Sequence, residues 1–205
     1  KRRAEEPQDI WMYGYDKIEG KSLTDDSPIK LDQSLQNSIY NLAVKLKDLG
    51  LTEVQTYSFY STAVLGALEP NRDNLNTLVK IANPISSETQ YLRDNLWPNL
   101  VEVIAKNLKQ GFKDIAIFEV GKIYKPNNET YHLSIALMNG TDNPLEELIS
   151  LFKSLSLHPG GGKLNPASLF HPARITENMA EVYLRVLNKL GIEKRVAILE
   201  LRLLI

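Results

Sequence analysis

The stretch that decides the fold is NPISSETQYLRDNLWPNL, residues 83–100. It begins with an Asn-Pro turn signal, passes a single arginine, Arg93, and enters an apolar pattern of helical period. Two roles are open to Arg93: its guanidinium could hold a phosphate in a catalytic site, or it could hold the fold together. What the rest of the chain places beside Arg93 decides between them.

After Arg93 the pattern predicts a helix. Asn95 is the expected N-cap, and Pro98 falls in the first turn, where a missing N–H costs little. Leu96, Leu100, Val103, Ile104 and Leu108 form the expected buried face. Gly111 is expected to end the helix.

Upstream, apolar residues at spacings of three and four predict a helix over 31–49, ended by Gly50. Residues rich in β-branched and aromatic side chains predict strands over 52–61 and 78–84. Residues 1–20 are interpreted as the tail of a preceding small domain with its linker, and 21–205 as one domain.

Downstream, a strand over 113–125, interrupted at Gly121, and a strand over 131–140 are expected to form a hairpin. The remaining elements are a helix (144–157), a loop-like stretch (158–175), a second helix (179–192) and a final strand (195–205). Hairpins without regular βαβ alternation favour an α+β fold, a mostly antiparallel sheet flanked by helices.

The composition excludes several classes of site. The chain has no cysteine, so thiolate metal sites and cysteine nucleophiles are excluded, and three histidines make a histidine-rich metal centre improbable. With 24 basic and 25 acidic residues, no strongly basic face is visible in the total charge. No apolar run has the length of a membrane span. A cytoplasmic protein without membrane contact is expected.

Glu119 is a charged residue inside an apolar strand, IFEVG. Strand alternation places it on the same face as Ile115 and Ile117. An unpaired buried carboxylate is costly, so Glu119 either lines a polar cleft or pairs with a basic residue such as Arg93. The pattern favours a structural role for Glu119, either in an ion pair or as a charge on an edge strand. By contrast, His171 is a single loop histidine without a partner and carries little weight as a ligand or base.

Several ordered segments resemble the beta subunit of bacterial phenylalanyl-tRNA synthetase. The Asn-Pro, Leu-Arg and Leu-x-Pro-x-Leu series of residues 83–107, followed by IFEVGKIY (117–124), carries most of the similarity. YGYDKI (13–18), LGLTEVQTYSFYS (49–61), FHPAR (170–174, with Ala173 in place of glycine) and the segment 189–201 extend it. The resemblance implies a class II synthetase core-like domain, here a fragment without the family's editing and anticodon-binding domains.

In this family the beta-subunit copy of the core is regarded as catalytically silent, so the resemblance implies no catalytic residue and no cofactor in this segment. ATP and Mg²⁺ belong to the whole enzyme. Class II enzymes use two arginines around the nucleotide. Arg93 lies where the first would be, whereas Arg174 lacks the glycine-rich context of the second. Arg93, Glu119, His171 and Arg174 are therefore interpreted as structural remains of such a site.

The implied role is assembly of an enzyme of two alpha and two beta subunits acting on tRNA(Phe). Tyr40, Tyr57, Phe59 and Tyr60 are the candidates for exposed interface aromatics, although each is equally well explained as an ordinary core residue. The domain would dock the alpha subunit and a second beta subunit and help to position the tRNA. Two alternatives remain open: a competent ATP-binding, adenylating domain, and a free-standing paralogue with another partner.

Overall fold

The computed structural model describes residues 33–68, 77–139, 143–157 and 179–203. The predicted boundary between residues 20 and 21, the loop-like stretch 158–175, and with it His171 and Arg174, lie outside the described residues. In the described part, no helix is long and apolar enough to cross a membrane.

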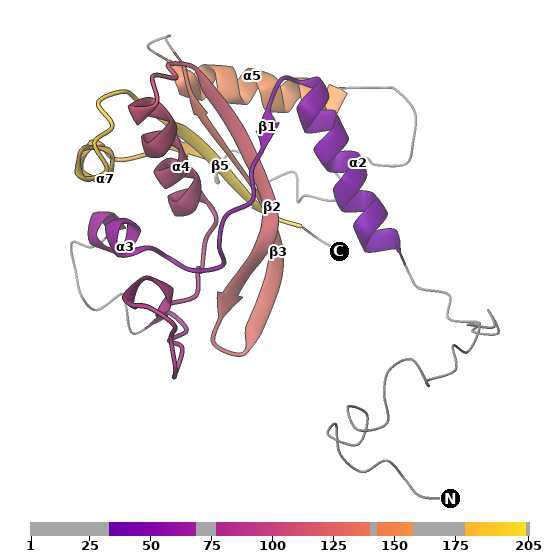
Figure 1. Cartoon of the computed structure of the whole chain (residues 1–205). Coiled ribbons are helices and arrows are strands. Elements are labelled where there is room, and N and C mark those ends of the chain that lie inside the picture. Colours follow the sequence, from indigo (N-terminus) through magenta and orange to yellow (C-terminus); the bar gives the residue numbers. More distant parts are fainter. Residues whose placement is uncertain (1–32, 69–76, 140–142, 158–178, 204–205) are drawn as a thin grey trace, which may run out of the picture. The chain divides into compact units, whose positions relative to one another are not determined.

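A five-stranded sheet forms the centre of the domain, in the order β1-β2-β3-β5-β4 (Figure 1). Its strands are β1 (Thr52–Glu53), β2 (Ile115–Lys125), β3 (Asn128–Met138), β4 (Met179–Glu181) and β5 (Ala197–Arg202). All neighbours run antiparallel except β1 and β2, which are parallel. The predicted mostly antiparallel sheet is confirmed.

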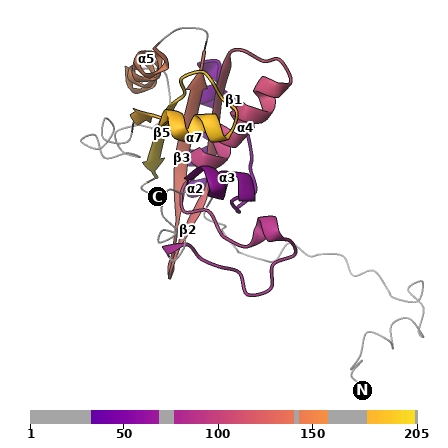
Figure 2. The same ribbon diagram turned by 90° about the vertical axis from the view of Figure 1, so that its left-hand side faces the viewer.

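Helices cover both faces of the sheet, which makes three layers (Figures 1 and 2). On one face lie α2 (Ser34–Asp48) and α5 (Pro144–Leu157), packed on Phe118 and the leucines of β5. On the other face lie α4 (Trp97–Lys109) and α7 (Leu184–Lys189), with α3 (Thr62–Leu68) against both. Because side chains of a strand alternate between faces, β2 sends Phe118 to one layer and Ile117 to the other.

The hairpin of β2 and β3 closes on a two-residue turn, Pro126-Asn127, with Lys125 opposite Asn128. Asn127 takes the left-handed conformation, φ 63°, which a type II turn requires at the position after its proline. The predicted interruption at Gly121 is wrong, since β2 pairs with β3 without a break through that residue. The missing side chain at Gly121 leaves space for the neighbouring Arg93 guanidinium and does not interrupt the strand.

Both upstream strand predictions were too long. Residues 52–61 contain the two-residue β1 and a single bridge, between Phe59 and Leu92. Between them the chain leaves the sheet, and Thr56 bonds a buried carboxylate. Residues 78–84 contribute a single bridge, between Lys80 and Tyr91. High β-propensity in these segments reflects half-buried packing and does not require a ladder.

The helix predicted over 179–192 was also too long. Its first three residues form β4, which pairs with the outer edge of β5, and α7 begins only at Leu184. The helix ends were predicted better: Gly50 and Gly111 follow α2 and α4 with φ of 87° and 94°, the left-handed conformation that ends helices.

Candidate functional site

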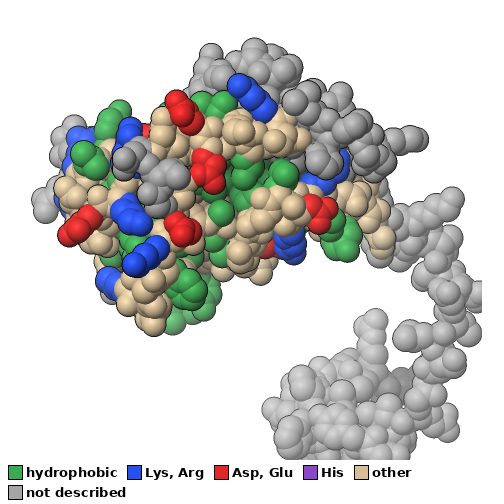
Figure 3. All heavy atoms as spheres, turned by 90° about the horizontal axis from the view of Figure 1, so that it is seen from above, with side chains coloured by type: hydrophobic (Ala, Val, Ile, Leu, Met, Phe, Trp, Pro, Cys, Tyr) green, Lys and Arg blue, Asp and Glu red, His purple; other side chains and the backbone are tan. Residues whose placement is uncertain are grey.

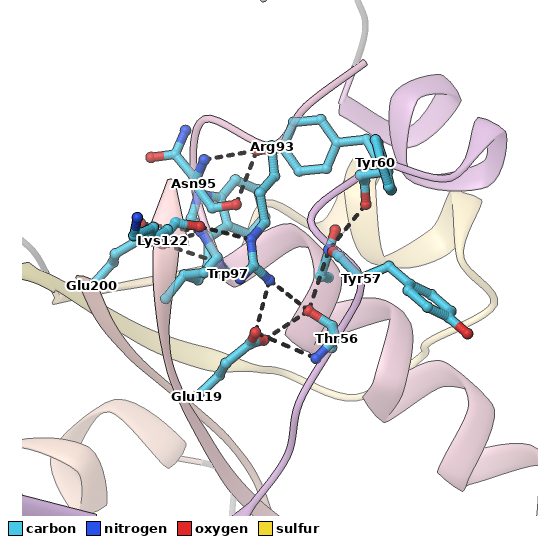
Figure 4. A network of polar contacts seen from close by, with 12 residues as sticks. Thr56, Tyr57, Tyr60, Arg93, Asn95, Trp97, Glu119, Lys122 and Glu200 are labelled. Carbon is cyan, nitrogen blue, oxygen red and sulfur yellow. Dashed lines mark hydrogen bonds and ion pairs between the residues drawn. The ribbon is translucent and has the colours of Figure 1, made fainter. Parts of the chain in front are cut away.

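Arg93 and Glu119 form a buried ion pair at the centre of the domain (Figure 4). Arg93 Nη1 lies 2.7 Å from Glu119 Oε1, and the two side chains are 4% and 1% exposed. The pairing expected from the sequence is therefore confirmed. At this depth each charge depends on the other, because removing one partner of a buried pair costs about 3–5 kcal/mol.

Further hydrogen bonds hold the guanidinium in place. Its Nε donates to the Lys122 carbonyl at 3.0 Å, and Nη1 also donates to Thr56 Oγ1 at 2.8 Å. The backbone of Arg93 is tied on both sides, since its N–H donates to the Ser58 carbonyl and its carbonyl accepts from the Tyr124 N–H. Arg93 thus joins the irregular 54–61 segment to strand β2.

Thr56 completes the coordination of the Glu119 carboxylate. Its hydroxyl donates to Glu119 Oε2 at 2.7 Å, and its N–H donates to Oε1 at 3.3 Å. The same hydroxyl accepts from Asn99 Nδ2, which also donates to the carbonyls of Tyr57 and Phe59. The pair is therefore part of a network that also fixes the start of α4.

The guanidinium lies against Gly121, which is next but one to Glu119 and so on the same face of β2. A methyl group added at Gly121 would come within 2.5 Å of Arg93 Nη2 and 3.3 Å of Glu119 Oε1. Since neither side chain of the ion pair can move without losing its partner, the glycine is required for this approach.

We expect Gly121→Ala to destabilise the domain by roughly 1–3 kcal/mol, because the new methyl displaces the guanidinium from its bonds. Gly66→Ala is the matched control: it lies inside α3 with open space around it, so its replacement should be neutral or slightly stabilising. Urea unfolding monitored by circular dichroism measures both. Equal stability of the two variants would show that Arg93 does not need the glycine.

A second carboxylate, Glu200 of β5, caps the N-terminus of α4. Its Oε2 accepts hydrogen bonds from the N–H groups of Leu96 and Trp97, each at 2.9 Å. Its Oε1 lies 3.1 Å from His132 Nδ1. The predicted Asn95 cap is wrong, because Leu96 is the N-cap residue and makes no side-chain cap bond. A carboxylate from a distant strand supplies the negative charge that a helix N-terminus favours.

Glu119, Ser134 and Glu200 stand opposite one another on β2, β3 and β5. Cross-strand partners share a face, so the three side chains form one polar row on the α4 side of the sheet. Each carboxylate in the row is held by a different group: Arg93 bonds one, and the first amides of α4 bond the other. The polar row is therefore satisfied from within the protein.

Tyr60 is a core residue, 1% exposed, and not an exposed aromatic. Its hydroxyl donates to Asp94 Oδ1 at 2.6 Å and accepts from the Asn95 N–H at 2.9 Å. Burial, and then the Asp94 carboxylate, raise the pKa of Tyr60 well above its usual value.

The raised pKa of Tyr60 predicts a loss of stability in alkali. The unfolded chain releases the phenol proton near pH 10 while the folded chain retains it, so the free energy of unfolding falls above that pH by up to about 1.4 kcal/mol per unit. In Tyr60→Phe this contribution should vanish and the alkaline slope should become shallower. Urea unfolding from pH 8 to pH 11 measures the slope. An unchanged slope in the variant would contradict the assignment.

Of the other interface candidates, Tyr40 on α2 is 68% exposed and Tyr57 is 87% exposed, while Phe59 is half-buried. Thr56, Asn99 and Glu200 were not singled out in the sequence. The signal for Glu200 was present, because a glutamate in the apolar run AILEL has the same pattern that drew attention to Glu119. Thr56 and Asn99 carry no such signal.

The charge of the described surface is mixed. On the face seen in Figure 3, lysine and arginine side chains are interspersed with aspartate and glutamate. Among the described residues, no group of three or more potential ligands from histidine, aspartate and glutamate could hold a metal ion. The face seen in Figure 3 is therefore not a strongly basic surface, and the described residues offer no metal centre.

Comparison with known proteins places this geometry in a family. Residues 23–147 match the model described as "Phenylalanyl tRNA synthetase beta chain CLM domain". The chain belongs to this family. Its relatives include the chloroplastic phenylalanine–tRNA ligase beta subunit of Gracilaria tenuistipitata var. liui, 30% identical over 83% of this chain and 24% of the relative. The beta subunit of Onion yellows phytoplasma (strain OY-M) is 36% identical over 62% of this chain and 15% of the relative.

The CLM-family chain thus spans a quarter or less of these relatives. Among solved structures, the pyrrolysyl-tRNA synthetase PylSc of Desulfitobacterium hafniense superposes with a TM-score of 0.61. The superposition covers 82% of this chain and 66% of that one at 16% identity, so it bears on the fold alone. The predicted class II synthetase core-like fold is confirmed.

Proposed function

We propose that this CLM-family domain is a non-catalytic scaffold of a phenylalanine–tRNA ligase. In this role it docks the alpha subunit, pairs with a second beta subunit and helps to position tRNA(Phe) in a cytoplasmic enzyme. ATP and Mg²⁺ would act elsewhere in that enzyme. The observation that carries the proposal is the ion pair of Arg93, whose guanidinium is buried against the Glu119 carboxylate.

A nucleotide site needs cations that converge on the phosphates where charge develops in the reaction. Arg93 Nη1 is already paired with a carboxylate oxygen at 2.7 Å, so a phosphate that bound this nitrogen would have to displace that carboxylate. The free energy of leaving Glu119 buried and unpaired opposes such an exchange. These contacts do not fit a competent ATP-binding site.

The N-terminus of α4 supports the same interpretation. Helix N-termini bind phosphates through their free amides. Here the amides of Leu96 and Trp97 donate to the Glu200 carboxylate, which a second anion would have to displace. Two positions that could hold a phosphate on this face of the sheet are therefore occupied by carboxylates of the protein itself.

We expect ATP with Mg²⁺ to produce no binding heat with this chain in isothermal titration at millimolar nucleotide. The adenylating alternative requires binding at micromolar to low-millimolar levels that Arg93→Ala abolishes. Lys125→Ala, a substitution of an exposed lysine at the end of β2, controls for non-specific attraction of the triphosphate. Binding that Arg93→Ala removes and Lys125→Ala retains would refute the silent scaffold.

For docking, the outward face of α2 is the favoured surface. Tyr40 and Val44 lie one turn apart on it and are both exposed, an arrangement that suits a partner helix.

Contact with tRNA would be local, since the chain has a net charge of only −1, and it would be weakened by salt.

We expect the double variant Tyr40→Ala/Val44→Ser to co-purify with the alpha subunit at least about tenfold less well than the parent chain, because central interface aromatics carry much of the binding energy. Tyr183→Ala is the matched control, since Tyr183 is similarly exposed (73%) but lies before α7 on the opposite face of the sheet. Unfolding curves should be unchanged in both. Equal recovery of both variants would argue against α2 as the docking surface.

A further inference from the structure

Helices α2, α4 and α7 end in the same backbone motif. In each, a glycine in the left-handed conformation follows the last turn, and the next residue donates its N–H to a carbonyl five positions earlier. The glycines are Gly50, Gly111 and Gly191, and the residues that donate are Leu51, Phe112 and Ile192, at 3.1, 3.2 and 2.9 Å. The side chain after the glycine commonly packs back on the helix that ends there.

Two of these three side chains are buried, and the third is not. Leu51 is 3% exposed and Ile192 is 0% exposed, and each belongs to a hydrophobic core of the domain. Phe112 is the largest of the three, and it is 59% exposed. Because the burial of a phenylalanine side chain is strongly favourable, a ring left in water at a position that usually packs indicates that another molecule covers it.

The backbone on both sides of Phe112 is fixed. Its N–H donates to the Asn107 carbonyl at 3.2 Å, and the side-chain amide of Asn107 donates in turn to the Val103 carbonyl at 2.9 Å. The carbonyl of the next residue, Lys113, accepts from Lys194 Nζ at 3.4 Å. A partner that binds the ring therefore has little of this backbone to order, and less entropy is lost on binding.

The charges near the ring are of both signs. Two segments meet here, 109–114 and 193–195, and their charged residues are Lys109, Lys113, Asp114, Glu193, Lys194 and Arg195. Arg195 is already paired with Glu181 at 2.7 Å. The remaining three lysines and two carboxylates leave an excess of one positive charge, whereas a nucleic-acid surface needs a pronounced basic patch. An aromatic ring inside a mixed polar rim is typical of a protein interface.

Phe112 lies at the same end of the sheet as the C-terminus of α2. Strand β1 follows α2 and strand β2 follows α4, each through a short connection, and β1 and β2 run parallel. Both helices therefore end where these two strands begin (Figure 1). Because β1 is the outermost strand, a partner on the outward face of α2 can extend past this end of the sheet to the ring.

We propose that Phe112 is a second anchor for the alpha subunit, in addition to Tyr40 and Val44 on α2. This inference rests on the proposed scaffold role and names a further residue of the same interface. The ring enters an apolar pocket of the alpha subunit, and the rim of that pocket carries charges of both signs, which pair with the lysines and carboxylates around Phe112.

Co-purification of the 205-residue chain with the alpha subunit tests this anchor. We expect Phe112→Ala to lower the recovery of the alpha subunit at least about fivefold, and Phe112→Leu to lower it less, because leucine keeps much of the apolar surface. Tyr183→Ala is the matched control, since it removes an aromatic ring that is 73% exposed just before α7. Equal recovery with Phe112→Ala and Tyr183→Ala would overturn the proposal.

Urea unfolding checks that the ring serves a partner and not the domain itself. Phe112→Ala should leave the unfolding midpoint unchanged, whereas Ile192→Ala, its buried counterpart after α7, should lower it. A midpoint lowered as much by Phe112→Ala as by Ile192→Ala would show that the ring packs on the domain, which contradicts the anchor.

The α2 variant separates this inference from the scaffold role. Adding Phe112→Ala to Tyr40→Ala/Val44→Ser should multiply the two losses of recovery, since separate contacts are additive in free energy. If only the α2 variant loses the alpha subunit, the scaffold role stands and the Phe112 anchor is wrong. If the parent chain recovers no alpha subunit, the scaffold role itself is wrong.

RNA is the other candidate for covering the ring, and a gel-shift titration with a tRNA(Phe) transcript measures it. We expect Phe112→Ala and the parent chain to bind the transcript alike. Weaker binding of the transcript by Phe112→Ala, together with unchanged recovery of the alpha subunit, would assign the ring to RNA and refute the anchor.

Discussion

The buried Arg93–Glu119 ion pair is the constraint on which the rest of the structure depends. A guanidinium and a carboxylate, both almost fully excluded from water, are stable only together and only if their remaining donors and acceptors are bonded. Thr56 and the Lys122 carbonyl provide those bonds, and Gly121 leaves the space for them. The need to satisfy one buried pair therefore determines the path of the chain before α3 and the residue permitted in the middle of β2.

The polar row across the sheet extends the same principle. Glu119, Ser134 and Glu200 lie on three adjacent strands, where a nucleotide-handling fold could place groups for a substrate. In this domain both carboxylates are bonded by groups of the protein itself. Arg93 neutralises Glu119, and the amides at the start of α4 donate to Glu200. An architecture shared with a class II synthetase core is thus stabilised by interactions that would compete with phosphate binding.

Among the residues that the structure describes, one buried side-chain oxygen, Asn99 Oδ1, has no hydrogen-bond partner. The Nδ2 of Asn99 donates hydrogen bonds to backbone carbonyls of the 54–61 segment, while its Oδ1 is buried and accepts none. The docking surface that we propose on α2 lies on the other face of the sheet, away from this atom.

Much of this was determined by the sequence alone. Period and turn signals predicted α2, α4, α5 and the β2–β3 hairpin, because those elements bury apolar residues in a regular repeat. Alternation and the cost of an unpaired buried charge predicted that Glu119 lines a polar cleft or pairs with a basic residue such as Arg93. Only the tertiary structure decided the length of β1, the replacement of Asn95 by Glu200 at the start of α4, and the burial of Tyr60. Each of these depends on a polar contact between residues 34 or more positions apart, and no local pattern encodes which distant group will meet a buried donor.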